Sequence, residues 1–467
     1  MSSSAESNTD TRRPTTELRK SLRVTDGIAL LIGITIGSGI FSTPSIIAQY
    51  YSSFDAIIFT WVVVAGFVLI GGLIYSELGT RFPVTGGEYV YLSKAFGPGV
   101  GFVFGWSQLI IIRTSPTAGL ALIAADYVSY FVPMGSGGRL IVAIGFIAFV
   151  ACLNYIGVER ASLFQKVTTV VKVGGLVLFA VGGLVLLHGR DGHLGDSIPI
   201  AVAGSPASAV VAALMLIVFT HVGWDRVGYV AGEMKNAREV IPKSMMIGMG
   251  IIIAIYLSVN TIYHSALGMA AMRATATPAA DVARMMVGPI GGGLIAVLAI
   301  VAAVGSINGT TMASSRVYYA MAHDGRFLRA FDFVHPRYQT PTRAIVAHAM
   351  WAVVILVVRG TFENIAAGMV FAVLIFYMLT TVALFKARRA NDGQPDAFRL
   401  PGYPVLPAIY LIGIVGLLTV RVYFFPGQSM ADLAYVASGI PVAYFWLRRK
   451  RQGGDASPPT IGTPAKA

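Results

Sequence analysis

Long apolar runs, separated by short polar segments, occupy most of this 467-residue chain. A bilayer core of about 30 Å is crossed by roughly 20 apolar residues in helical conformation. Twelve runs come close to that length or exceed it: 24–48, 56–80, 99–130, 139–157, 163–187, 208–232, 245–268, 291–320, 343–359, 364–386, 405–425 and 432–447. They lack the residue-by-residue alternation typical of membrane β-barrel strands. The pattern therefore predicts an all-α membrane protein with twelve transmembrane helices.

Composition and charge agree with a protein embedded in lipid. Hydrophobic residues make up 55% of the chain and charged residues 12%, whereas soluble domains carry about 25% charged residues. The net charge of +13 is not a nucleic-acid signal, because the basic residues are unevenly divided between the two sides. With the N-terminus inside, 26 of the 35 Lys and Arg residues fall in inner segments and six in outer ones. The positive-inside rule then predicts that both termini are cytoplasmic.

Two of the runs are interrupted by glycine and polar residues. The first contains GITIGSGIF and the sixth contains FTHVGWDRVG. Each glycine weakens a helix by roughly 1 kcal/mol relative to alanine. Interrupted helices at corresponding positions of two halves are typical of the binding site of a secondary transporter.

The two interrupted runs are five runs apart, and this interval predicts how the chain is divided into repeats. An odd number of helices per repeat places the two repeats in opposite orientation, so a 5+5 inverted repeat is predicted. We expect a cytoplasmic tail at 1–23, a transporter domain at 24–447 and a disordered cytoplasmic tail at 448–467. Within the domain, 24–187 form the first repeat, 208–386 the inverted second repeat, and 405–447 the last two helices.

Six motifs, in order along the chain, resemble those of the amino acid–polyamine–organocation transporters, especially their L-type amino-acid branch. They are GSGIF (37–41), YSELGTRFPVTGGEYVYLSKAFG (75–97), EMKNAREVIPKS (233–244), GSINGTTMASSRVYYAMAHDGRF (305–327), HPRYQTP from His335 and FRLPGYPVLP (398–407). The resemblance covers nearly the whole chain after residue 23. It implies the LeuT fold and sodium-independent movement of amino acids by alternating access.

The interruptions offer partners for both charged ends of an amino acid. A carboxylate binds free N–H groups where a half-helix begins, at its positive dipole end. By analogy with the family, we expect the carboxylate at Ser38, Gly39 and Ile40, with Gly37 and Gly39 allowing close approach to the backbone.

The ammonium is expected to meet carbonyl groups freed at the two breaks, those of Thr35, Phe219 and Val222. The family resemblance also implies that Phe219 is a gate that closes over the substrate from outside. An ordinary packing or lipid-facing phenylalanine is an equally weighted alternative. Gly223 lies in the same break and is included among the substrate-binding residues.

Lys172 lies about 13–14 Å into the fifth run, near the middle of the bilayer. A lysine there costs roughly 2.5–3.5 kcal/mol on insertion, so a functional role is the first hypothesis. Some sodium-independent relatives carry a lysine here that resembles a replacement for a sodium ion bridging helices 1 and 8. The alternatives are a fixed cation that holds the helices together, a group that releases a proton during the transport cycle, and a side chain that reaches the membrane interface.

His221 departs from the family pattern at the sixth run. An imidazole can titrate near physiological pH and couple protons, or it can shape the pocket. A hydrogen-bonded packing residue is the commoner role of a histidine inside a membrane protein. The sequence also leaves open whether Arg113 neutralises Asp225, what Arg226 does, and whether Glu77 and Glu233 form a cytoplasmic gate or are solvated carboxylates.

Other classes of function are disfavoured. The chain has no GxxxxGK[ST], HExxH or CxxC motif, so no ATP hydrolysis, metal or cofactor is expected, and we do not expect an enzyme. Mammalian L-type transporters join a heavy chain through a cysteine between helices 3 and 4. The corresponding FVPMGSGGR has none, so no disulfide-linked heavy chain is expected.

The sequence thus predicts a secondary transporter of amino acids, neutral L-amino acids first, in a bacterial plasma membrane. It would work by sodium-independent exchange or proton symport. A polyamine or cationic amino-acid carrier of the same fold is the alternative, and a channel or an intramembrane enzyme is the alternative from another class.

Overall fold

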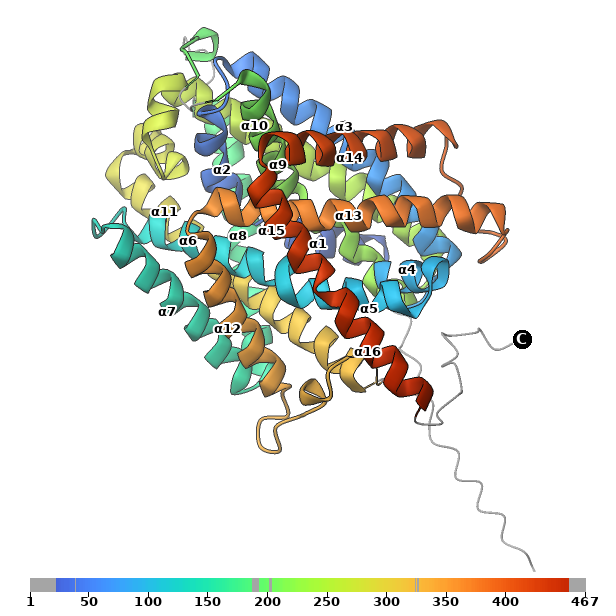
Figure 1. The fold of residues 1–467 in the computed structure, drawn as a ribbon. Helices are drawn as coiled ribbons and strands as arrows, with labels where there is room; N and C mark the ends of the chain where they lie inside the picture. Colours follow the sequence, from blue (N-terminus) through green and yellow to red (C-terminus); the bar gives the residue numbers. More distant parts are fainter. Residues whose placement is uncertain are drawn as a thin grey trace, which may run out of the picture.

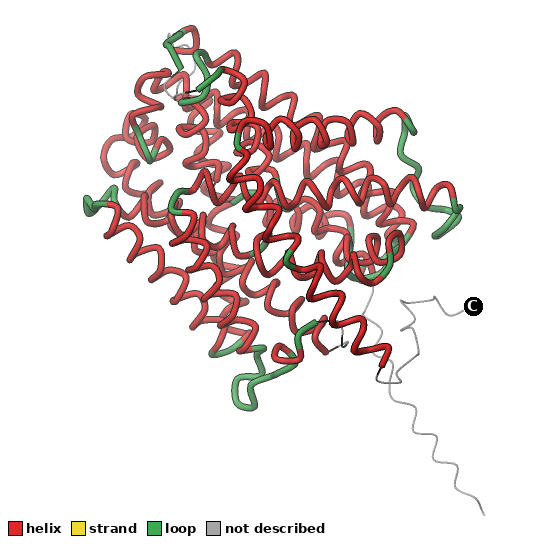
Figure 2. The backbone as a smooth tube through the Cα atoms, in the orientation of Figure 1, coloured by secondary structure: helices red, strands yellow, loops and turns green. Residues whose placement is uncertain are grey.

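The computed structural model of the chain describes residues 22–37, 39–186, 193–200, 204–323, 325 and 327–452. Helices make up most of this part, and short loops join them at the edges of the bundle (Figure 2). No strand forms among the described residues, although isolated bridges pair Leu22 with Met234 and Ser53 with Ser197. The prediction of an all-α protein is confirmed.

The helices are, in chain order, α1 (Val24–Thr35), α2 (Gly39–Ala48), α3 (Phe54–Arg81), α4 (Glu88–Phe96), α5 (Pro98–Ser107), the π-helical η1 (Gln108–Ile112), α6 (Thr114–Val128), α7 (Ser136–Tyr155), α8 (Val158–Leu186), the short η2 (His193–Gly195), α9 (Pro206–His221), the 3-10 helix η3 (Trp224–Glu233), α10 (Ala237–Ala274), α11 (Pro278–His323), η4 (Arg329–Phe331), α12 (Thr342–Arg359), α13 (Phe362–Arg389), α14 (Val405–Phe424), α15 (Pro426–Ala437) and α16 (Gly439–Gln452).

Ten helices of the described part are long and apolar enough to cross a bilayer, and the bent pair α1 and α2 is an eleventh if counted as one span. The twelfth predicted run, 432–447, is divided at Ser438 between α15 and α16. At about 1.5 Å per residue, neither of these two helices alone spans the hydrocarbon core. Length and apolarity therefore account for ten or eleven spans of the twelve predicted.

The tails also differ from the prediction. Residues 448–452, expected to be disordered, continue α16 to Gln452. Residues 1–21 and 453–467 lie outside the described part, whereas Leu22 donates its N–H to the Glu233 carbonyl at 3.0 Å.

The two interrupted helices lie inside the bundle. α1 packs against α10, and α8 packs along α11, while α7 and α12 lie side by side at one edge (Figure 1). Peripheral helices expose large apolar side chains, such as Ile141 on α7 and Leu178 on α8. This arrangement suits a bundle whose rim faces lipid and whose interrupted helices line its interior.

Candidate functional site

The first interruption separates α1 from α2. Regular winding ends at Thr35, resumes at Gly39, and the two half-helices meet at an angle of 49°. The Gly37 N–H donates to the Thr35 carbonyl at 2.8 Å. Ser38 lies outside the described residues, so its predicted contacts stay predictions. The interruption itself is where the sequence predicts it.

The second interruption lies between α9 and η3. Val222 is extended and Gly223 has φ +128°, in the left-handed region that favours glycine. A Cβ on Gly223 would lie 3.2 Å from the Cα of Thr35. Gly223 is therefore the point at which the second break packs directly against the end of α1.

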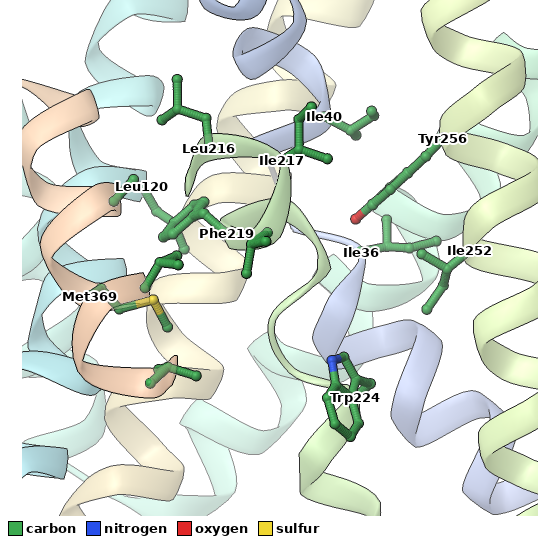
Figure 3. Close-up of a cluster of buried hydrophobic side chains, with 14 of the residues drawn as sticks. Ile36, Ile40, Leu120, Leu216, Ile217, Phe219, Trp224, Ile252, Tyr256 and Met369 are labelled. Carbon is green, nitrogen blue, oxygen red and sulfur yellow. The ribbon is translucent and has the colours of Figure 1, made fainter. Parts of the chain in front are cut away.

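Tyr256 of α10 joins the two interruptions. Its hydroxyl lies 3.1 Å from the Thr35 carbonyl and 3.1 Å from the Thr220 carbonyl. It points toward the unwound chain from the neighbouring helix (Figure 3). The single O–H of this phenol is thus shared between a freed carbonyl at the end of each half-helix. Sequence reasoning missed this role because nothing in the pattern of α10 marks this tyrosine.

A cavity of about 380 Å³, here called the central cavity, lies between the two interruptions. Six of the predicted site residues line it: Thr35, Gly37, Gly39, Lys172, Phe219 and Val222. Ile40 and Gly223 do not line it, since Ile40 is packed in the core of α2 and Gly223 faces α1. The structure thus brings together residues of α1, α8 and α9 that lie far apart in the sequence.

His221 does not reach the central cavity. Its ring lies 5.5 Å from the Trp61 ring and 5.3 Å from the Tyr256 ring, and its Nδ1 is 2.8 Å from the Ile217 carbonyl. His221 is two residues after Phe219, a separation of about 200° around the helix axis. His221 therefore faces away from the side on which Phe219 lies. The pocket contact predicted for His221 is absent, and the ring packs α9 against α3 and α10.

Lys172 connects three helices. Its Nζ donates to the Gly33 carbonyl of α1 at 2.8 Å and to the Ser306 hydroxyl of α11 at 3.3 Å. Lys172 is 2% exposed, so its ammonium is buried inside the bundle. It lies where it holds α8 to both α1 and α11.

The central cavity continues from the break along the first half-helix. It runs along the half of α1 that begins at Val24, between Leu30, Thr169 and Ala313. At the other end, the Phe219 ring contacts the Phe362 ring edge-on, with centroids 5.3 Å apart. Figure 3 shows Phe219 beside the end of α9, with Leu120 of α6 and Met369 of α13 on one side of it.

Further contacts close that other end. The Tyr127 hydroxyl donates to the Phe41 carbonyl at 2.7 Å. The Arg273 guanidinium donates to the carbonyls of Ala48 at 2.9 Å and Tyr51 at 2.7 Å. These contacts close the Phe219 side of the site, whereas the lining of the central cavity continues along α1 toward Val24.

Charged groups lie next to the second interruption, beyond the central cavity. Asp225 accepts from the Tyr377 hydroxyl at 3.4 Å, and the Arg113 Nε donates to Gln108 at 2.6 Å. Within the described residues no ion pair joins Arg113 to Asp225, so the neutralisation that the sequence left open does not occur by direct contact. Arg226 itself lines the central cavity.

The cavity, the two interruptions and the apolar rim are together typical of secondary transporters, membrane proteins whose solute site lies at broken helices within the bundle. Over residues 23–446 the chain matches the amino acid permease family, and it belongs to this family. It is 29% identical over 438 residues to the serine/threonine exchanger SteT of Bacillus subtilis, covering 93% of this chain and 98% of SteT.

Animal proteins are similar over nearly the same length. The human b(0,+)-type amino acid transporter 1 is 25% identical over 442 residues, which cover 93% of this chain and 90% of that protein. The human cystine/glutamate transporter is 25% identical over 440 residues, which cover 92% of this chain and 86% of that protein. The chain is thus a multi-pass membrane transporter of the amino acid permease family and not an enzyme.

Proposed function

We propose that this chain carries neutral L-amino acids across a bacterial plasma membrane by sodium-independent exchange. The observation that supports this most is the central cavity between the two interruptions, whose 380 Å³ suits a single amino acid. The name of the exchanger SteT favours exchange over proton symport, which remains the alternative.

The proposed fold has twelve transmembrane helices and a 5+5 inverted repeat of the LeuT type. In this assignment α1 and α2 form the first helix of one repeat, and α9 and η3 form the first helix of the other. α15 and α16 together form the twelfth. The repeats span 24–187 and 208–386, as expected from the sequence, and both termini are cytoplasmic. Transport would proceed by rocking of α1, α2, α3, α9, η3 and α10 against the other helices.

In the proposed binding mode, the substrate carboxylate lies at the N-terminal end of α2, at Ser38, Gly39 and Ile40. The ammonium lies at carbonyls of the second interruption. The Thr35 carbonyl already accepts from Gly37 and from Tyr256, and the Phe219 carbonyl accepts from the Val222 N–H at 3.1 Å. The Val222 carbonyl is therefore the most available acceptor of the three. Phe219 is the proposed gate on the closed side.

Charge in the central cavity disfavours the polyamine or cationic alternative. Among the described residues that line it, Lys172 and Arg226 are cationic and none is Asp or Glu. A second ammonium on the substrate would meet cations without a carboxylate to offset them. No covalent heavy chain is proposed, since the single cysteine, Cys152, lies in α7.

Uptake into proteoliposomes tests the proposed function. We expect labelled L-threonine to enter several times faster into vesicles loaded with unlabelled L-threonine than into empty ones, with no sodium and no pH gradient. L-Arginine and putrescine should compete poorly. Uptake that requires an inward proton gradient and ignores the internal amino acid would replace exchange by symport, and strong competition by putrescine would favour the alternative substrate class.

Removing the Tyr256 hydroxyl should slow exchange without unfolding the protein. Tyr256→Phe leaves carbonyls at both interruptions without this donor, a cost of about 1–3 kcal/mol for a buried group. We expect exchange in proteoliposomes to fall about tenfold. Tyr263→Phe is the matched control on the same helix, because the Tyr263 hydroxyl is buried and no described residue forms a hydrogen bond with it. Equal exchange by the two variants would contradict the linking role of Tyr256.

A further inference from the structure

A second cavity, of about 280 Å³, lies at the closed end of the bundle. Tyr50, which follows α2, lines it together with residues of α9 and α13 and of the segment from α14 to α15. Its apolar wall includes Ala212, Leu216 and Phe425. The volume is enough for one amino acid, and no described residue lines both this cavity and the central cavity.

The positive side of the second cavity is Arg421. One oxygen of the Asp432 carboxylate accepts from Arg421 at 2.8 Å, and the other accepts from Arg359. Two guanidinium groups therefore share one carboxylate, and the cluster keeps one excess positive charge. Arg421 is 2% exposed, and its Nε is buried with no hydrogen-bond partner in the described chain. A buried donor of this kind is costly unless a ligand or water accepts from it.

The negative side is Glu363, in the first turn of α13. It is the one carboxylate among the residues that line the second cavity, and no ion pair with a described residue neutralises it. Burial raises the pKa of Tyr50 to about 12, and the Glu363 carboxylate contributes to that rise. Tyr50 is therefore a neutral hydroxyl near physiological pH, and it offers a hydrogen bond rather than a second negative charge.

We propose that the second cavity binds a zwitterionic amino acid, with its carboxylate on Arg421 and its ammonium on Glu363. A simple anion would meet the charge of Glu363, and a simple cation would meet that of Arg421. A ligand with both charges satisfies both groups. An ethanolamine phosphate headgroup shares this chemistry, and the choice of a free amino acid rests on the proposed function.

The second cavity adjoins the proposed gate. Leu216 lines it from α9, and Phe219, three residues later on the same helix, lines the central cavity. Phe362, whose ring contacts Phe219, precedes Glu363 in the chain. An amino acid in the second cavity would thus lie behind the Phe219–Phe362 contact, on the side from which the gate must open.

Binding stoichiometry of the purified full-length protein tests this site. We expect labelled L-threonine to bind at two sites per chain, and at one in Glu363→Gln and in Ala212→Leu, which fills the cavity. The affinity of the lost site should fall at least about tenfold, as for removal of a charged hydrogen-bond partner. Glu159→Gln, in the first turn of α8, and Ala207→Leu, exposed on α9, are matched controls and should keep two sites.

The outcomes separate the two proposals. If the wild type binds one threonine and neither variant changes it, the second site is refuted while the central site stands. If the wild type binds one threonine and Glu363→Gln binds none, the central site fails and the second site stands. Displacement by O-phosphoethanolamine or phosphatidylethanolamine, without any second threonine, would assign the cavity to a lipid headgroup and overturn the amino-acid proposal.

Discussion

Lys172→Ala is expected to lower amino-acid exchange about 10- to 100-fold. The change removes the ammonium that donates to the Gly33 carbonyl at 2.8 Å and to Ser306 at 3.3 Å. Hydrogen bonds from a charged group contribute about 1.5–3 kcal/mol each, so the loss is enough to shift the balance between conformations by one to two orders of magnitude. Because the contacts join α8 to α1 and α11, the loss should fall on the transport cycle rather than on substrate recognition alone.

The measurement is exchange of labelled L-threonine in proteoliposomes, in sodium and in choline buffers. Lys166→Ala is the control, since Lys166 lies on α8 as well but is exposed. Normal exchange by Lys172→Ala would show that the ammonium does not act as a cation surrogate. Partial recovery in sodium alone would support that role directly, because oxygen atoms of Gly33 and Ser306 would then be free to hold a cation.

The two interruptions were predictable because their causes are local. Glycines and polar residues at 37–39 and 221–223 disfavour helix within a single run, whatever surrounds them. Lys172 was conspicuous for the same reason, since a lysine deep in an apolar run needs a partner. Which helices supply that partner depended on the family resemblance, not on spacing.

The rest of the site depends on the rotation of each helix about its axis and on which helices pack against it. Neither can be inferred from the pattern of a single sequence. His221 lies in the second break, yet its ring packs on Trp61 of α3 because of its angular position on α9. Tyr256 looks like one more aromatic residue of α10 until the fold brings its hydroxyl between two broken helices. The last predicted run is not one helix, because α15 ends at Ala437 and α16 begins at Gly439, a division that apolar length does not indicate.

Glu77 shows how burial decides between two interpretations of a carboxylate at a helix end. A solvated interfacial carboxylate was one interpretation, and it is wrong, because the Glu77 side chain is fully buried. It accepts from Arg81 at 2.9 Å, from Arg388 at 2.7 and 2.6 Å, and from the Leu400 N–H at 2.8 Å. One carboxylate thus joins α3, the end of α13 and the loop that leads to α14.

Glu77→Gln should therefore be strongly destabilising. The amide keeps the size of the side chain, but it leaves Arg81 and Arg388 without their counter-charge at a buried position. Removing one partner of a buried ion pair costs about 3–5 kcal/mol, and we expect Tm in detergent to fall by several degrees. Glu239→Gln is the matched control: Glu239 pairs with Lys243 at 2.6 Å at an exposed position, where ion pairs contribute little. If both variants have the Tm of the wild type, the ion pairs of Glu77 do not stabilise the fold. The burial of Glu77 would then be explained by a role in opening and closing of the Val24 end alone.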